Sequence, residues 1–429
     1  MVKIKAVRAR EILDSRGNPT IETMIWSDAG HVAVASVPSG ASTGKFEAVE
    51  LRDRDMTRFR GMGVLKAVAN VNTMIAPKII GMDPLYQSKV DKMLVELDGT
   101  ENKSKLGANA ILSVSQAVCE LGAWVSGRSV FQYLADKYSL ANLGAVSMPV
   151  PIFNLINGGK HGAGNNLDFQ EFHVISSSRV GFSESLKIGD TIYQTLKDAL
   201  IKRNAVYSVG DEGGFAPNLY TNIDALELLV EAITVSNYAL GKDVFLGLDA
   251  ASDSFYKNGK YLITDKTQPL TSNEMIEFYV QLSKDYQLFE LEDGLMEDDF
   301  DGWARLKEAV GTSVLIVGDD LLVTNKKRLE EAIAKKACNS ILVKPNQIGT
   351  VSETVEVIKV AKENKFSVVV SHRSGETTDD FISDFAVGVG ADYVKFGAPA
   401  RGERVVKYNR LTLIENLLQS RVAPARQVV

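Results

Sequence analysis

Six strand-length apolar segments in the second half of the chain each end in polar or charged residues, and this repeat constrains the fold more than any other feature. The segments are VFLGLD (244–249), LFELED (288–293), SVLIVGDD (313–320), SILVKPN (340–346), SVVVSHRSG (367–375) and YVKFGAPA (393–400). The residues that mark their ends, at intervals of 43, 27, 25, 28 and 23 positions, are Asp249, Glu292, Asp319, Lys344, His372 and Lys395. A strand, a loop and a covering helix need about 25–30 residues, so the spacing predicts alternating strands and helices.

The composition of these segments predicts an α/β barrel. Continuous Val and Ile runs with helical segments between them are typical of a parallel sheet that is covered on its faces. The wide first interval holds FYKNGKYLIT, whose Asn258-Gly259 pair predicts an extra hairpin. The roughly 285 residues beyond position 146 suit a (β/α)8 barrel with additions. An open, doubly wound sheet is the alternative, although no strand is followed by the G-x-G-x-x-G pattern of its dinucleotide-binding form.

The first part of the chain has a different pattern and predicts a separate domain. A chain of 429 residues exceeds what one hydrophobic core usually serves. The first 40 or so residues predict short strands with turns between them, and residues 65–138 predict helices, including a buried helix in LGANAILSVSQAVCELGAWV. Pro149 and Pro151 then disfavour helix. We expect domains at 1–138 and 146–429, with the boundary near 138–146.

Acidic residues end three successive predicted strands. Barrel enzymes work at the carboxyl ends of their strands, so Asp249, Glu292 and Asp319 should share one mouth. Three buried carboxylates need compensation, and an all-oxygen set favours magnesium over zinc. The competing interpretation is that these acids only cap helices. The adjacent Asp293 and Asp320 should point the other way if the strands persist, as supporting or capping groups.

Two lysines end later strands of the same series. Lys344 and Lys395 should enter the same crowded mouth, where a neighbouring cation disfavours protonation and can turn one lysine into a base. A basic lysine beside a metal-bound carboxylate could remove the proton alpha to that carboxylate. The alternative is that both lysines are ordinary salt-bridge partners of the acids.

Two loops outside the series contain candidate functional residues. The Gly/Ser-rich loop at 37–45 is not a phosphate-binding P-loop, because its spacing is one residue short and Phe46 replaces the required Ser or Thr. We expect a mobile lid in which Ser39 offers oxygen ligands on closure. The second loop, GDEGGF (210–215), places acids between glycines that let the backbone approach a substrate, although such segments are usually only turns.

Composition excludes several classes of function. A net charge of −6 argues against a nucleic-acid partner, and no run of 18 apolar residues predicts a membrane span. The first residues lack the features of a signal peptide. Only two cysteines are present, Cys119 and Cys338, and both are expected to be buried, inert thiols in a reducing compartment. We therefore expect a cytoplasmic protein without a zinc site.

Many long, ordered motifs make the chain resemble the enolase family over essentially its whole length. They are AREILDSRGNPTIE, PSGASTG, KSKLGANAILSVS, NGGKHGAGNNLDFQEF, GDEGGFAP, GLDAAS, ELEDGLMEDDFDGW, VGDDLLVTN, VKPNQIGT, SHRSGET and KFGAPARGER. The resemblance implies a modified (β/α)8 barrel with an N-terminal α+β capping domain. It also implies the reversible dehydration of 2-phospho-D-glycerate to phosphoenolpyruvate in glycolysis and gluconeogenesis, by a homodimer or octamer.

The resemblance assigns two magnesium ions to each active site. Asp249, Glu292 and Asp319 would hold the first ion, and Ser39 would bind the second, which arrives with the substrate.

Proton transfer and substrate contacts are assigned in the same way. Lys344 would be the general base, and Glu212, supported by Glu171, would protonate the departing hydroxide. His161 matches the family's substrate-loop histidine and would belong to the catalytic residues, and Gln170 matches a substrate-side amide. Arg373 and Ser374 would hold the phosphate, Lys395 would contact the carboxylate or metal region, and His372 would also bind the substrate.

Several positions depart from the common pattern of the family. Lys45 and Phe46 stand where an acid and another aromatic residue or histidine are usual, and Glu290 and His173 replace residues that are more often uncharged. Phe396 is bulkier than usual and should point away from the barrel mouth. We expect none of these residues to touch a proposed ligand or proton carrier.

Two other functions remain as alternatives. Racemase or cycloisomerase relatives commonly carry a second base in a Lys-x-Lys pattern, which Lys344-Pro345-Asn346 does not match. A binding protein with an idle site is the other alternative, although an intact set of reactive residues speaks against it.

Overall fold

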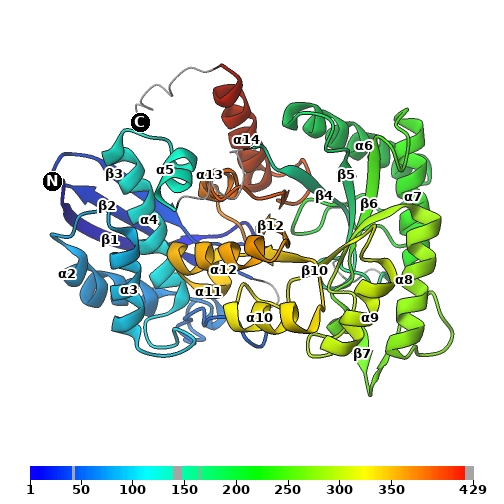
Figure 1. Cartoon of the computed structure of the whole chain (residues 1–429), viewed down its shortest axis with the longest axis horizontal. Coiled ribbons are helices and arrows are strands. Elements are labelled where there is room, and N and C mark those ends of the chain that lie inside the picture. The colour runs from blue at the N-terminus through cyan, green and yellow to red at the C-terminus, as the bar shows by residue number, and fades with distance from the viewer. Residues whose placement is uncertain (41–43, 139–146, 163, 165, 421–429) are drawn as a thin grey trace.

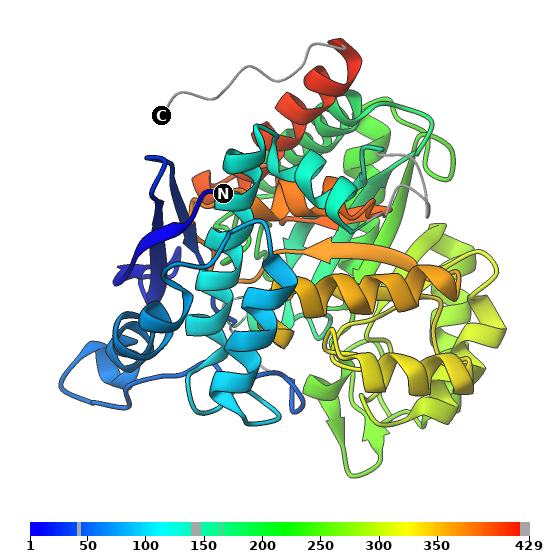
Figure 2. The same cartoon turned by 60° about the vertical axis from the view of Figure 1, so that its left-hand side comes forward.

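The computed structural model describes residues 1–40, 44–138, 147–162, 164 and 166–420. A smaller N-terminal part packs beside a larger barrel, and the two lie on opposite sides of the molecule in Figures 1 and 2. The boundary expected at 138–146 falls almost wholly outside the described residues and stays a prediction, as does any order in the tail after position 420.

The N-terminal part combines a small sheet with helices, as expected. Its antiparallel strands are β1 (Ile4–Leu13), β2 (Pro19–Ser27) and β3 (Val32–Ser36). The helices that follow are η1 (Phe59–Gly61), α1 (Leu65–Asn70), η2 (Val71–Ile75), α2 (Ala76–Ile79), α3 (Gln87–Asp98), α4 (Ala108–Ser126) and α5 (Val130–Lys137). Helix α4 is the predicted buried helix, and it packs against β2 and β3 on one side and against α3 on the other.

Eight strands close into a barrel in the order β10-β11-β12-β13-β4-β5-β6-β9. These strands are β4 (Val150–Asn157), β5 (Glu171–Ser176), β6 (Val244–Asp249), β9 (Leu288–Glu292), β10 (Leu315–Gly318), β11 (Ser340–Val343), β12 (Ser367–Ser371) and β13 (Tyr393–Lys395). The closed order confirms the barrel and excludes the open sheet. All six apolar segments of the sequence supply one strand each.

One strand runs against the expected parallel direction. Strand β5 is antiparallel to both β4 and β6. The reason is its connection: β4 and β5 are joined by the short segment 158–170, whose described residues form one turn of helix, η4 (Gly159–His161), and no crossover helix. The reversal brings the first residue of β5, Glu171, to the end of the barrel where the other strands finish.

Helices surround the barrel, as Figure 1 shows. They are α6 (Phe182–Lys202), α7 (Asn222–Val235), η5 (Ser252–Phe255), α8 (Ser272–Tyr286), α9 (Phe300–Val310), α10 (Lys326–Lys335), α11 (Pro345–Ile348), α12 (Val351–Glu363), α13 (Phe381–Gly388) and α14 (Gly402–Ser420). The predicted hairpin is present as β7 (Tyr256–Lys257) and β8 (Lys260–Tyr261). Among the described residues, no helix combines the length and apolar character needed to cross a bilayer.

Below the polar barrel mouth, the interior of the barrel is filled with apolar side chains. They are Ile152, Ile175, Val317, Leu342 and Val369, each at most 1% exposed. A packed floor of this kind holds the polar residues above it in fixed positions.

Candidate active site

A polar cavity lies at the barrel mouth and collects most of the residues that the sequence singled out. The predicted site residues that line it are His161, Gln170, Glu171, Glu212, Asp249, Asp319, Lys344, His372, Arg373, Ser374 and Lys395. Glu292 lies just below the cavity, in contact with Lys395, whereas Ser39 lies apart. The sequence positions therefore converge in space, and each can be placed by its contacts.

Two of the three predicted metal ligands meet around one lysine. Lys395 Nζ lies 2.6 Å from Glu292 Oε2, 3.3 Å from Asp249 Oδ2 and 3.2 Å from Glu171 Oε2. Burial lowers the pKa of Lys395, but Glu171, Glu292 and Asp249 outweigh it and hold that pKa well above its usual value. The lysine is therefore an ammonium ion that neutralises part of the carboxylate cluster.

The third predicted ligand is paired with the other lysine. Asp319 follows β10 and accepts hydrogen bonds from Lys344 Nζ at 2.5 Å and Gln347 Nε2 at 2.9 Å. The expected depression of the lysine pKa is not present here. Burial lowers the pKa of Lys344, but Asp319 raises it further, so the net shift is upward. In this state Lys344 is protonated, because an unneutralised Asp319 holds its proton.

These carboxylates fit a hard cation. Glu292 is 1% exposed, and its Oε1 has no hydrogen-bond partner among the described residues. Burial, Asp249 and Asp319 all raise the pKa of Glu292 well above its usual value, because the three acids crowd one another. An unpaired oxygen in a crowded set of carboxylates is the donor arrangement that magnesium accepts.

Asp293, the acid next to Glu292, does not point away from the barrel mouth. Alternation along the strand predicts the opposite direction, provided that the strand continues. Strand β9 ends at Glu292, and Asp293 adopts a left-handed φ of 43°. The turn carries its carboxylate across to the next strand, where it accepts hydrogen bonds from Asp319 N at 3.0 Å and Asp320 N at 2.8 Å. The carboxylates of Asp293, Asp319 and Asp320 lie close enough together to form a possible cation site, as do the ligand atoms of His161, Glu171 and Glu212. The assumption that failed was that the strand persists, while the supporting role expected for Asp293 agrees with these hydrogen bonds.

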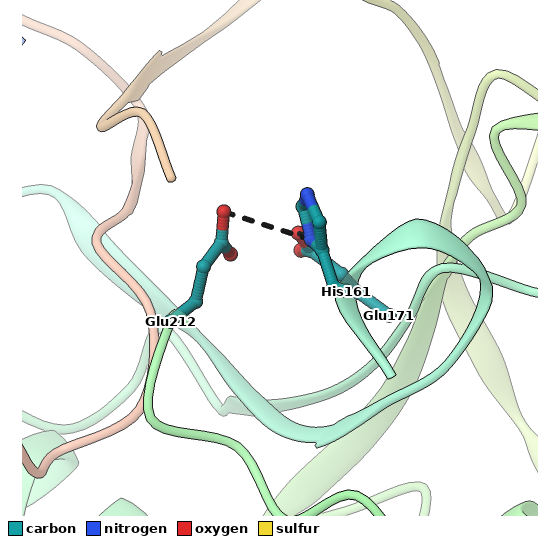
Figure 3. A group of neighbouring side chains, drawn as sticks. All are labelled: His161, Glu171 and Glu212. Carbon is teal, nitrogen blue, oxygen red and sulfur yellow. Dashed lines mark hydrogen bonds and ion pairs between the residues drawn. The ribbon is translucent and has the colours of Figure 1, made fainter. Parts of the chain in front are cut away.

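A second cluster lies on the opposite side of the cavity, and Figure 3 shows it. His161 and Glu171 lie together and face Glu212, with His161 Nδ1 3.0 Å from Glu171 Oε1 and 3.6 Å from Glu212 Oε1. Glu212 comes from the glycine-flanked loop between α6 and α7. A Cβ at Gly210 would lie 2.5 Å from the backbone oxygen of His161, so only glycine lets this loop approach so closely.

Glu212 is fully surrounded by polar partners. Its carboxylate oxygens lie 3.1 Å from His372 Nε2, Ser374 Oγ and Asn154 Nδ2. Burial and Glu171 raise its pKa, but His372 and His161 together bring it down to about 2. With the cavity in this state Glu212 is a carboxylate. Asn154 was not among the residues predicted from the sequence, although it stands on β4, two residues before the end of an apolar run.

Arg373, expected to hold phosphate, is already paired with an acid. Its Nη1 lies 3.0 Å from Glu47 Oε2 and 2.9 Å from Asn346 Oδ1. Burial lowers the pKa of Arg373, but Glu47 and Asp319 raise it overall. The guanidinium therefore presents a fixed positive charge at the cavity wall.

Ser39 and Gln170 differ in how they relate to the cavity. Gln170 Nε2 donates to Asp249 Oδ2 at 3.2 Å, which places it among the ligand candidates. Ser39 Oγ donates instead to Asp14 and lies 3.3 Å from Arg16 Nη2, at the edge of the N-terminal part. Positions 41–43 of its loop, which belong to the expected lid, lie outside the described residues.

One expectation about the unusual residues is wrong. His173 does touch a proposed catalytic group, because its Nε2 lies 2.9 Å from Glu171 Oε2, and its Nδ1 lies 2.8 Å from Glu290 Oε2. The signal was available in the sequence. Position 173 is two residues from 171 and position 290 is two residues from 292, so each pair shares one face of its strand. Phe396, in contrast, packs outside the mouth against Tyr408, as expected.

Comparison with known families covers nearly the whole chain. Residues 4–134 match the family described as "Enolase, N-terminal domain". Residues 145–427 match the family described as "Enolase, C-terminal TIM barrel domain". Both matches agree with the fold and with the motifs around the cavity. The chain belongs to the enolase family and is a lyase-type enzyme of that superfamily.

Proposed function

We propose that the protein catalyses the reversible dehydration of 2-phospho-D-glycerate to phosphoenolpyruvate, as a phosphopyruvate hydratase of glycolysis and gluconeogenesis. One observation carries the proposal: Lys344 and Glu212 line the same buried cavity, from different sides, with a carboxylate cluster and Arg373 beside them. Elimination of water needs a base for the C2 proton and an acid for the leaving hydroxide. The cavity holds a candidate for each.

Two magnesium ions complete the proposed site. Asp249, Glu292 and Asp319 would hold the first ion, and Ser39 would bind the second, which arrives with the substrate. When bound, magnesium supplies positive charge that stabilises the substrate carboxylate as it gains electrons, and it neutralises Asp319, which otherwise holds the Lys344 proton.

Lys344 is the proposed general base. Its ammonium is buried, and burial alone lowers the pKa of a lysine. The Asp319 carboxylate, 2.5 Å away, is the largest influence that keeps that proton in place, and Glu292 adds to it. Arg373 and Lys395 both favour the neutral amine, so a cation held by Asp319 would leave Lys344 able to act as a base. Lys344 would accept the C2 proton, while Lys395 would face the substrate carboxylate.

Glu212 is the proposed general acid. It must carry a proton when hydroxide leaves, and the negative charge of a phosphorylated acid beside it favours that protonated form. His161, which is itself paired with Glu171, lies against it on one side, and His372 and Ser374 hold it from the other. The proton is thereby kept near the departing oxygen.

The phosphate would bind on the Arg373 side. Arg373 and Ser374 follow β12 and offer a guanidinium and a hydroxyl, and Gln170 offers an amide on the opposite wall. Substrate phosphate would displace Glu47 from Arg373, because a guanidinium pairs with phosphate in the same bidentate way as with carboxylate. We further propose a cytoplasmic homodimer or octamer, as the family resemblance implies.

Turnover under controlled metal tests this proposal. With 2-phospho-D-glycerate and Mg2+, ultraviolet absorbance should grow as phosphoenolpyruvate forms. A chelator should reduce the rate to background, and returned Mg2+ should restore it, because the carboxylate cluster is incomplete without a cation. Absence of turnover with every divalent cation tried would refute the proposed function.

A further inference from the structure

A buried histidine and a buried glutamate lie directly beneath the proposed proton-transfer residues. The ring of His173 bridges two carboxylates, with Nε2 2.9 Å from Glu171 Oε2 and Nδ1 2.8 Å from Glu290 Oε2. His173 is 0% exposed and Glu290 is 1% exposed. No part of the mechanism above uses either residue.

Strand register explains why the two side chains meet. His173 of β5 and Glu290 of β9 are both paired with Gly247 of β6, which runs between them. A Cβ at position 247 would lie 2.3 Å from Glu290 Oε2, so the missing side chain of Gly247 is the space that the carboxylate fills. The pair therefore depends on three strands that are far apart in sequence.

The layer above repeats the same register with the catalytic candidates. Glu171, Asp249 and Glu292 are paired across the same three strands, each two residues from its counterpart below. Residues two apart on a strand share a face, so the lower layer supports the upper one. The contact between the layers is made at one particular atom, because His173 lies against Glu171 Oε2.

The hydrogen-bonding inventory fixes what the ring must do. An ionised carboxylate can only accept, so an imidazole between two of them must donate from both nitrogens, unless one carboxyl carries a proton. Burial lowers the pKa of His173, but Glu290 and Glu171 outweigh it and raise that pKa to about 9. A doubly protonated ring donates to Glu171 from Nε2 and to Glu290 from Nδ1.

Hydrogen bonds connect the other oxygen of Glu171 with Glu212, the proposed general acid. Glu171 Oε1 lies 3.0 Å from His161 Nδ1, and His161 Nε2 lies 3.1 Å from Ser374 Oγ. That hydroxyl donates to Glu212 Oε1 at 3.1 Å. An unbroken series of hydrogen bonds thus joins Glu290 to Glu212, whereas Lys344 has its contacts on the other wall, with Asp319.

We propose that His173 and Glu290 are a positioning pair for the elimination step. His173 holds Oε2 of Glu171 so that Oε1 and His161 face Glu212, and Glu290 fixes the orientation of the imidazole. This inference rests on the proposed function, and it predicts an effect on loss of water but not on removal of the C2 proton. The competing view is that the pair only balances charge and fills space.

Two nearly isosteric double variants separate these views. Both variants carry E290Q, which replaces the carboxylate of Glu290 with an amide. They differ at position 173: the side chain in H173Q can donate to Glu171, and the side chain in H173M cannot. We expect H173M/E290Q to lower kcat for dehydration roughly 10- to 100-fold, a typical effect of losing a partner that orients a catalytic group. H173Q/E290Q should recover much of that loss. In both variants KM and the rate of C2 hydrogen exchange in D2O should stay within about twofold of wild type, because Lys344 keeps its contacts.

Controls make the outcome decisive. Thermal unfolding checks that both variants fold, and H173L/E290L replaces H173M/E290Q in the comparison if the methionine variant does not. R410M, which breaks the buried pair with Asp384 on α13, should change stability but leave kcat unchanged. Equal kcat in the glutamine and methionine variants, or a parallel fall in C2 exchange, would overturn the positioning role. A wild-type protein without turnover would instead refute the proposed function, and the inference with it.

Discussion

Replacing Lys344 with alanine should abolish exchange of the C2 hydrogen of 2-phospho-D-glycerate together with turnover. A positioned general base contributes roughly 10²- to 10⁴-fold to a rate, and no other described lysine contacts Asp319 directly. Loss of the amine leaves the C2 proton without an acceptor, so the reaction stops before any bond to oxygen breaks. Hydrogen exchange followed by NMR in D2O, alongside phosphoenolpyruvate formation, measures both steps.

The matched control for this variant is another buried lysine. Lys103 pairs with Glu353 at 3.0 Å, outside the cavity, so K103A removes a buried, paired ammonium without touching the site. K103A should keep wild-type exchange and turnover. Residual C2 exchange at the wild-type rate in K344A would show that a different group is the base.

Replacing Glu212 with glutamine should separate the two steps. E212Q keeps the size of the side chain, but it exchanges one accepting oxygen for an amide NH2 and cannot deliver a proton, so elimination should fall by roughly 10²- to 10⁴-fold. C2 exchange should persist, because Lys344 and its partner Asp319 lie on the other wall. The same pair of assays on E212Q measures this difference.

E415Q is the control for the loss of a buried carboxylate. Glu415 caps the start of α6 by accepting from Phe182 N and Ser183 N, away from the cavity. E415Q should lower stability without changing the ratio of exchange to elimination. If E212Q lost exchange and elimination to the same extent, the assignment of the two proton carriers would be wrong.

Much of the fold could be predicted because local residue patterns indicate it. The apolar strands, their charged ends and the helices between them appear in the sequence with the spacing of a barrel, and the hairpin at Asn258 follows from its turn residues. The direction of β5 could not be predicted in this way. Strand direction depends on whether the connection holds a crossover helix. No residue pattern in the segment 158–170 showed that β4 and β5 are joined directly, without such a helix.

Strand direction and register also explain which site residues could not be predicted from local patterns. Strand ends identified Asp249, Glu292, Asp319, Lys344 and Lys395, because parallel strands finish at one mouth. Glu171 begins its strand instead of ending it, so only the family resemblance pointed to it. The meeting of His173 with Glu290 depends on register across Gly247, which no single segment of sequence contains.

Asp293 shows where a local rule stops applying, although its expected supporting role agrees with the structure. Alternation along a strand predicts that the residue after Glu292 faces outward. The chain leaves the extended conformation at that residue, with φ at 43°, and its carboxylate turns to the backbone of Asp319 and Asp320. A pattern holds only as far as the hydrogen-bonded strand that produces it.

The most direct test of the account is the position of the cation. Crystals grown with Mn2+, which shares the oxygen preference of magnesium, should show an anomalous peak between Asp249, Glu292 and Asp319. A peak found only at Asp293, Asp319 and Asp320, or only at His161, Glu171 and Glu212, would contradict the account, and so would the absence of any peak at the barrel mouth.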